Sequence, residues 1–215
     1  MNAKPSKSQL SKPHQGLLID RHEFGEIQKA IGIFEAEREK AIATSREIIT
    51  LSKQIIYAVH RGDMTKAEGL IPTIRESVSA LPAGFIDTDM PRVARQEFVE
   101  AASYLEFVKR SRLPTRKELG VEWHEYLTGL CDLTGELVRK AVKDVIEHKY
   151  ENAKKIHALV DEIYGAFLEF DLRGGELRKK SDSIKWNLKK LEDIMYDIEL
   201  KQKLEHSESE HEEGA

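Results

Sequence analysis

The chain has 215 residues, enough for one domain with a substantial core, and its 33% charged and 40% hydrophobic residues are typical of a soluble helical protein. Because it contains no apolar run of roughly 18 residues or more, we expect no membrane-spanning helix. The N-terminal sequence "MNAKPSKSQLSKPHQG" lacks the apolar segment of a signal peptide. A single cysteine, Cys131, excludes an intramolecular disulfide and favours a reducing, cytoplasmic location.

The net charge of −4 argues weakly against a nucleic-acid-binding protein, but the charge is unevenly distributed. The segment 205–215, "EHSESEHEEGA", contains five acidic residues, so removing it changes the charge from −4 to +1. Local basic patches therefore matter more than the total. Polar composition at both ends predicts disordered tails at 1–16 and 205–215, with one domain over 17–204.

Apolar residues recur at helical spacing along almost the whole chain, and no segment alternates as a strand does. The pattern predicts helices over about 20–61, 63–80, 88–110, 121–148, 150–171 and 176–204, with a short helical turn in "LPTRKELG" (113–120). Pro72 predicts a kink or break in the second helix. Short connections between long helices predict an all-α, single-domain antiparallel bundle of about six to seven helices.

The helix predicted over 88–110 carries two carboxylates on its apolar side. At about 100° per residue, Glu97 and Glu100 fall on the same side as Tyr104 and Phe107. A buried charge without a partner is costly, so these positions need a reason. One reason would be pairing with a lysine or arginine from another helix, and the other would be a functional site.

A second acidic pair follows in "CDLTGEL" (131–137), where Asp132 and Glu136 are one helical turn apart. Gly129 and Gly135 lie beside them and leave room for close approach. These two acids could line a solvated helix face with Arg139 as an ion-pair partner. They could instead join Glu97 and Glu100 from a facing helix in a site rich in carboxylate oxygen.

Such a site would suit Mg²⁺, with Mn²⁺ as the alternative, because both cations prefer oxygen ligands. A metal held there could activate water and stabilise charge on a phosphodiester. The sequence has no phosphate-binding loop, nucleophile elbow or zinc-ligand spacing. A di-iron bundle would require Glu-x-x-His pairs, and the segments "EFVE" and "EYLTGLCD" lack the histidine. We expect the histidines, His60 at a helix end included, to be structural or solvated, and Cys131 to fill a core position.

Four segments together resemble the translin/TRAX family, in the right order over about 35–200. They are "ATSREIITLSKQIIYAVHRG", "RQEFVEAASYLEFVKRSRL", "YLTGLCDLTGELVRKAV" and "LRKKSDSIKWNLKKLEDIMYDIELK". The second resembles the glutamate-bearing helix of TRAX-type subunits, Q-E-Y-V-E-A, and the third resembles their D-L-T-G-E-L-x-R segment. The acidic residues make the chain TRAX-like. Its connection between the third and fourth helices is shorter than in TRAX, and the histidine-rich basic stretch of translin is not matched.

The resemblance implies a barrel-like oligomer that encloses RNA, by family likeness an octamer, with Mg²⁺-dependent endoribonuclease activity. TRAX itself depends on translin as partner, whereas the compact form of this chain, between the two types, favours a homo-oligomer. It implies catalytic roles for Glu97, Glu100 and Asp132, which would also hold the metal. Glu136, in the same segment as Asp132, would orient or deprotonate the attacking water. The RNA, single-stranded or duplex, would be bound through phosphate contacts, for which the candidates are Arg92, Arg95, Arg139 and Lys143.

Two other functions remain open from the sequence. A translin-type protein would bind RNA or DNA without cutting it, and would not need Glu97, Glu100 and Asp132. A helical scaffold would use the same acids only as ion-pair partners, with neither metal dependence nor RNA affinity.

Overall fold

The computed structural model describes residues 19–82 and 87–213, with side chains as far as residue 203. Within these ranges every regular element is a helix, which confirms the all-α prediction. The helices are α1 (Arg21–Arg61), α2 (Met64–Ser79), α3 (Met90–Arg110), α4 (Arg116–Leu119), α5 (Trp123–Ile146), α6 (Tyr150–Leu168) and α7 (Gly175–Glu213). None of the described helices is both long enough and apolar enough to cross a bilayer. The predicted tail at 1–16 lies outside the described residues.

The chain divides into two units within the long helix α1, whereas the sequence predicts one domain over 17–204. The first unit ends at Glu39 and the second begins at Lys40. In the first unit α1 exposes large apolar side chains, namely Phe24, Ile27, Ile31 and Ile33. The second unit contains the hydrophobic core, which begins with Ala41 and Ile48 of α1 and continues to Ile198 of α7.

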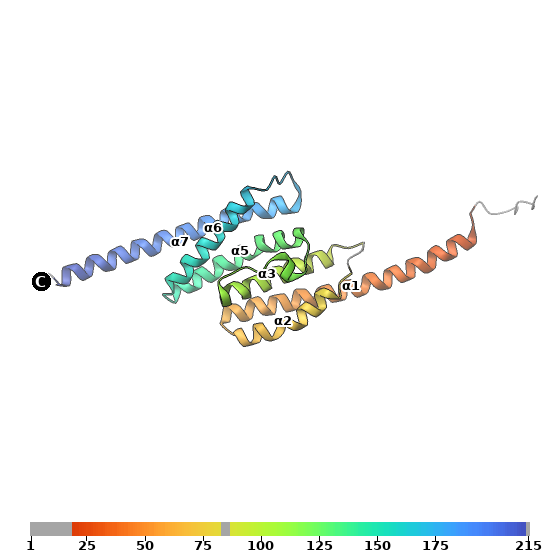
Figure 1. Ribbon diagram of the computed structural model, residues 1–215, viewed down its shortest axis with the longest axis horizontal. Coiled ribbons are helices and arrows are strands. Elements are labelled where there is room, and N and C mark those ends of the chain that lie inside the picture. Colours follow the sequence, from red (N-terminus) through yellow and green to blue (C-terminus); the bar gives the residue numbers. More distant parts are fainter. Residues whose placement is uncertain (1–18, 83–86, 214–215) are drawn as a thin grey trace, which may run out of the picture. The chain divides into compact units, whose positions relative to one another are not determined.

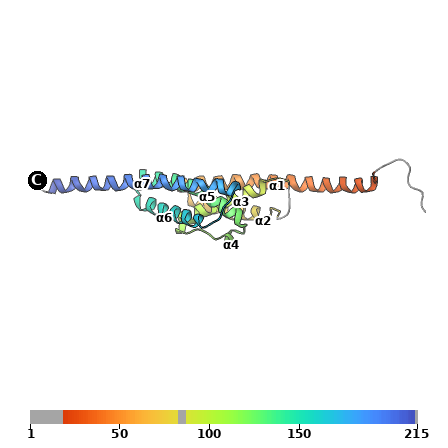
Figure 2. The ribbon, with the colours of Figure 1, turned by 90° about the horizontal axis from the view of Figure 1, so that it is seen from above.

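Helices α3 and α5 lie side by side in the middle of the second unit (Figures 1 and 2). Helix α2 packs on α3, whereas α6 and α7 pack on α5 and on each other. As a result α3 is buried on most of its circumference rather than along the single apolar face that the sequence pattern predicts. Phe98, Val99 and Tyr104 are completely buried on different sides of it.

The structure differs from the sequence prediction at one expected helix break and at one expected helix end. Helix α2 continues through Pro72 without a break, because Pro72 and Glu68, whose carbonyl loses its helical partner, are both exposed and water can take the place of the missing bond. Helix α7 extends to Glu213 rather than ending at about 204. Its last part contains neither glycine nor proline before Gly214, so nothing in this stretch stops the helix.

The close contact of α3 with α5 depends on Gly129. A Cβ atom at this position would lie 2.7 Å from the Cβ of Val99 and 2.8 Å from the carbonyl oxygen of Gln96. Both are atoms near the backbone of α3, so neither can move without displacing the helix. Gly135, which the sequence suggested for the same role, meets only the Asn187 amide at 3.9 Å.

Replacing Gly129 with alanine should therefore destabilise the protein. We expect the added methyl to push α3 from α5 and to lower the free energy of unfolding by about 1–3 kcal/mol, the usual cost of overpacking. Urea denaturation measures this. Gly135→Ala on the same helix is the matched control and should be neutral or stabilising by up to about 1 kcal/mol. Equal effects of the two substitutions would show that the contact at Gly129 does not constrain the helices.

Candidate acidic site between three helices

A pocket of about 240 Å³ in the second unit brings together α1, α3 and α5. Its lining is mostly charged or polar and consists of Lys53, Ile56, Tyr57, Glu97, Glu100, Glu136 and Arg139. The local geometry follows from helical spacing, since Glu97 and Glu100 are one turn apart on α3 and Lys53 and Tyr57 are one turn apart on α1. Three of the four acids predicted from the sequence therefore share one pocket.

Glu97 and Glu100 are only partly exposed, and among the described residues neither carboxylate forms an ion pair or hydrogen bond. Burial, followed by the negative charges of Asp132, Glu97 and Glu136, raises the pKa of Glu100 to about 8. Burial also raises the pKa of Glu97, although the positive charge of Lys53 partly opposes this. Glu100 therefore lacks the predicted ion pair with a basic residue of another helix. For Glu97 such a residue, Lys53, acts only through its charge at longer range.

Asp132 is near these acids but is neutralised from another helix. Its Oδ2 accepts a hydrogen bond from the ammonium group of Lys180 on α7. Asp132 nevertheless contributes to the raised pKa values of both glutamates, so its charge acts in the same site. Asp132 is therefore ion-paired, as one interpretation of the sequence predicted. Its partner is a lysine of α7 and not Arg139.

Glu136 is held in a different way. Its Oε2 accepts a hydrogen bond from the Nε2 of His60 on α1 and lies 3.6 Å from the guanidinium of Arg139. The bond from His60 is the main cause that lowers the pKa of Glu136. His60 is only 6% exposed, and its Nδ1 lies 3.1 Å from the hydroxyl of Tyr104. Glu136 is therefore ionised and held in place, in contrast to Glu100.

The four basic residues predicted to bind phosphate are placed unequally. Arg92 is ion-paired with Glu176 of α7, and Arg95 donates to the carbonyl oxygens of Leu81 and Pro82. Lys143 donates to the carbonyl oxygen of His60. Arg139 is 61% exposed at the pocket and has only its long contact with Glu136. Of the four, Arg139 is thus the one most available to a ligand at this pocket.

The donor set of the pocket fits a hard divalent cation. The side chains there offer carboxylate oxygen. Burial and then repulsion between the acids raise the pKa of Glu100, and added positive charge would relieve the repulsion. Among the described residues, no three His, Cys, Asp or Glu side chains are grouped closely enough to hold a metal ion as they stand. Mg²⁺ is usually bound through one or two carboxylates and several waters, so such a group is not required. Metal binding by Glu97, Glu100 and Asp132 stays a prediction.

Four residues of this site are missed by the sequence analysis: Lys53, Tyr57, His60 and Lys180. Three of them share a signal that could have been read, because positions 53, 57 and 60 fall on one face of α1. His60 is therefore part of this acidic site rather than an isolated helix end. Lys180 had no such signal, since its contact with Asp132 depends on the packing of α7 against α5.

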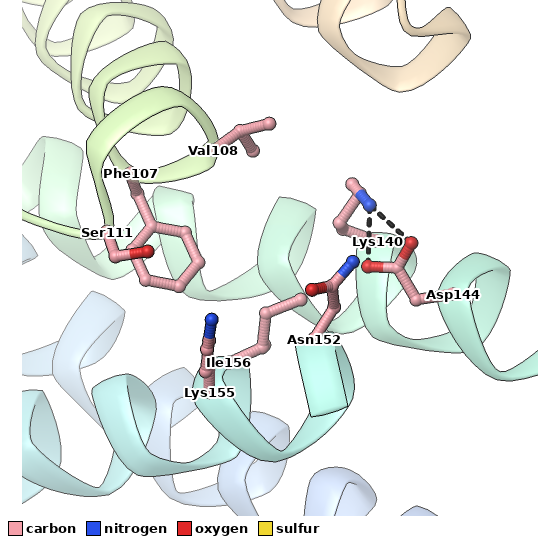
Figure 3. Close-up of a pocket in the computed structure, with 8 residues that line it drawn as sticks. All are labelled: Phe107, Val108, Ser111, Lys140, Asp144, Asn152, Lys155 and Ile156. Carbon is pink, nitrogen blue, oxygen red and sulfur yellow. Dashed lines mark hydrogen bonds and ion pairs between the residues drawn. The ribbon is translucent and has the colours of Figure 1, made fainter. Parts of the chain in front are cut away.

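A second hollow, of about 170 Å³, lies between the end of α3 and helices α5 and α6 (Figure 3). Figure 3 shows that Lys140 and Asp144 form an ion pair at its side, and Asp144 is only 1% exposed. The charges of Lys140 and Asp144 cancel each other. None of the acids predicted from the sequence lines the hollow. The candidate chemistry therefore belongs to the pocket of α1, α3 and α5.

These features define a helical protein whose central helix pair carries a partly buried cluster of carboxylates. The chain belongs to the Translin family, because the sequence model of that family matches residues 36–202. It is 27% identical over 209 residues to Translin of Gallus gallus, covering 86% of this chain and 88% of the relative. It is 24% identical over 225 residues to Translin-associated protein X of Mus musculus, covering 83% and 78%.

Solved structures share the fold. The crystal structure of apo-NeC3PO superposes with a TM-score of 0.70 and 26% identity, over 83% of this chain and 97% of that chain. AfC3PO has a TM-score of 0.68 and 25% identity, over 80% and 94%. The AfC3PO–duplex RNA complex, at 24% identity and a TM-score of 0.66 over 80% and 93%, matches in fold.

The raised pKa of Glu100 predicts a pH-dependent effect of Glu100→Gln. Between the ordinary value of 4.5 and about 8, rising pH ionises Glu100 in the unfolded chain but not in the folded one, so the folded state loses stability over this window. The variant lacks this loss. Its advantage in free energy of unfolding should rise from near zero at low pH to a few kcal/mol above pH 8, since a tenfold change in proton affinity is worth about 1.4 kcal/mol.

Chemical denaturation of both proteins in EDTA, at a series of pH values across this window, measures the difference. A difference that stays constant with pH would show that the Glu100 carboxyl is not buried among like charges.

Proposed function

We propose that this protein is a metal-dependent endoribonuclease, a TRAX-like catalytic subunit that hydrolyses phosphodiester bonds of RNA. The observation that carries the proposal is the pocket in which Glu97 and Glu100 of α3 meet Glu136 of α5 without neutralising partners for Glu100. Burying carboxylates together costs stability unless something else compensates. A divalent cation and a substrate would give these side chains the partner that the described residues lack.

In this proposal Glu97, Glu100 and Asp132 hold Mg²⁺, with Mn²⁺ as a possible substitute. When bound, the cation supplies positive charge that stabilises the negative charge developing on the phosphodiester. Glu136, kept ionised by His60, accepts a proton from the attacking water. Asp132 would offer its Oδ1, since Lys180 binds its Oδ2, and the ammonium group of Lys180 would also be near enough to the site to bind a phosphate oxygen.

The RNA would approach through the exposed rim of the pocket. Arg139 and Lys53 are basic residues of the lining and are both exposed, and AfC3PO, a protein of the same fold, was solved with duplex RNA. Contacts to phosphate would make binding weaken steeply as salt increases. Arg92, Arg95 and Lys143 could contribute only after giving up their present partners within the protein.

We further propose a homo-oligomer, for which an octamer is the family expectation. In the first unit Phe24, Ile27 and Ile31 form an exposed apolar stripe on one face of α1, with exposed fractions of 54%, 45% and 56%. A contiguous exposed apolar stripe is typical of a surface that another subunit covers. A cytoplasmic location accords with the one cysteine, which is buried and free.

The second candidate function is RNA or DNA binding without cleavage, as in translin-type subunits. Two observations favour it: the identity to Translin is slightly higher than to Translin-associated protein X, and Asp132 and Glu136 each have an ion-pair partner, Lys180 and Arg139. A scaffold role is weaker, since it leaves the unpaired Glu100 without a reason.

Cleavage of a labelled single-stranded RNA and of the matching duplex, with Mg²⁺ and with EDTA, tests the proposal. We expect cutting that needs the metal and that Glu100→Gln lowers at least about 100-fold, because the variant removes a charged ligand without disturbing the fold. Glu76→Gln, which alters an exposed carboxylate on α2, is the control and should cut like the wild type.

Salt-sensitive binding of RNA without cutting would replace the proposal by the translin-type function. Cutting that survives Glu100→Gln would place the activity in another centre or in a contaminant. If the protein neither binds nor cuts RNA, the scaffold function remains.

The oligomer is tested by replacing Phe24 and Ile31 with serine. We expect a lower mass in light scattering after size-exclusion chromatography, because the stripe that subunits would bury becomes polar. Ile33→Ser is the control, since Ile33 is 63% exposed but lies about 180° around the helix from Phe24. An unchanged mass for the double variant would show that this stripe does not hold the subunits together.

A further inference from the structure

His60 is a buried ionisable residue that the sequence pattern assigned to no function, and it is fixed from three sides. Its Nε2 contacts the Oε2 atom of Glu136 on α5, and its Nδ1 lies 3.1 Å from the hydroxyl of Tyr104 on α3. The rings of His60 and Tyr104 are 4.9 Å apart between centroids. The backbone is held as well, because Lys143 donates to the carbonyl oxygen of His60 near the end of α1. One imidazole thus connects the three helices that line the acidic pocket.

The direction of the hydrogen bonds follows from the two neighbours. Burial raises the pKa of Tyr104, so its hydroxyl stays protonated and can donate to Nδ1. The carboxylate of Glu136 is ionised and can only accept, so Nε2 carries the hydrogen. In this tautomer each of the three side chains has a hydrogen-bond partner. A chain of hydrogen bonds runs from Tyr104 through His60 to Glu136.

The contacts of Glu136 are unsymmetrical. His60 and Arg139 both approach Oε2, whereas Oε1 accepts no hydrogen bond among the described residues. Glu136 lines the pocket together with Glu97 and Glu100. A carboxylate with one oxygen anchored and the other available has the arrangement required of a fixed proton acceptor.

We propose that His60 is a positioning residue for Glu136: its Nε2–H anchors Oε2, Tyr104 fixes the ring, and Oε1 is thereby directed to receive the proton of the water that attacks the phosphodiester. This inference rests on the proposed ribonuclease function. His60 itself touches neither substrate nor metal in this assignment. Its effect reaches the reaction only through Glu136, and this separates it from a residue that merely stabilises the fold.

Steady-state cleavage of RNA by four proteins tests the coupling: the wild type, His60→Ala, Glu136→Gln and the double variant. We expect His60→Ala to lower kcat about 10–100-fold with little change in KM, the usual effect of losing a group that orients a catalytic residue. In the Glu136→Gln background, adding His60→Ala should produce no further loss of kcat. His60→Gln should recover part of the activity, since its amide can still donate to Glu136.

A second readout needs neither metal nor activity. The ¹⁵N shifts of the imidazole nitrogens, recorded in EDTA, should identify His60 as the Nε2–H tautomer, and Glu136→Gln should alter them. His157→Gln is the matched control, because His157 lies on α6 outside the pocket and forms no hydrogen bond, ion pair or ring contact among the described residues. It should leave kcat and the His60 shifts unchanged.

The outcomes separate the two proposals. Loss of cleavage in Glu100→Gln together with full activity in His60→Ala overturns the role of His60 and leaves the ribonuclease standing. Equal losses from His60→Ala in both backgrounds show that His60 does not act through Glu136. Cleavage that persists in Glu100→Gln removes the proposed function and this inference with it. If His60→Ala does not fold, Tyr104→Phe replaces it. We expect a smaller loss of kcat from this variant. An unchanged kcat would show that Tyr104 does not fix the ring of His60 for the reaction.

Discussion

The contact between Gly129 and the backbone of α3 determines where the acidic side chains lie. Glu97 and Glu100 are within two residues of Val99, against which Gly129 packs. Asp132 and Glu136 follow Gly129 by about one and two helical turns on the same side of α5. A side chain at position 129 would separate the helices and draw the two acidic pairs apart. The site therefore depends on a glycine that carries no chemistry itself.

Once the four acids are close, their surroundings sort them into two kinds. Asp132 is ion-paired with Lys180 of α7, and the ionised Glu136 accepts a hydrogen bond from His60 of α1. Glu100 has no such partner, and its pKa rises because burial and like charges favour the neutral form. Acids pushed in opposite directions within one pocket are typical of sites that bind cations or transfer protons, although structural ion pairs also do this. The proposed function is built on that contrast.

The sequence predicts the helices well because their apolar spacing, their glycine ends and their caps are local. Asp63, for example, accepts a hydrogen bond from the backbone of Lys66 at the start of α2, as its position after Gly62 suggests. It predicts less about partners. The ion pairs of Arg92 with Glu176 and of Asp132 with Lys180 depend on how α7 packs. The spacing of residues within one helix does not predict them. His60 is missed because its importance lies in two contacts that cross to other helices.

Overall similarity is nearly the same to both types of named relative, so the two proposed functions differ in a few side chains rather than in the fold. The identities to Translin and to Translin-associated protein X differ by only a few per cent, and most of the matched length is the helical core that any such protein needs. The core would pack equally well with glutamine at positions 97 and 100, and without like-charge repulsion it would be more stable. Ionisable groups that destabilise the fold therefore support a function, because such a cost is retained where the charges do something that neutral side chains cannot.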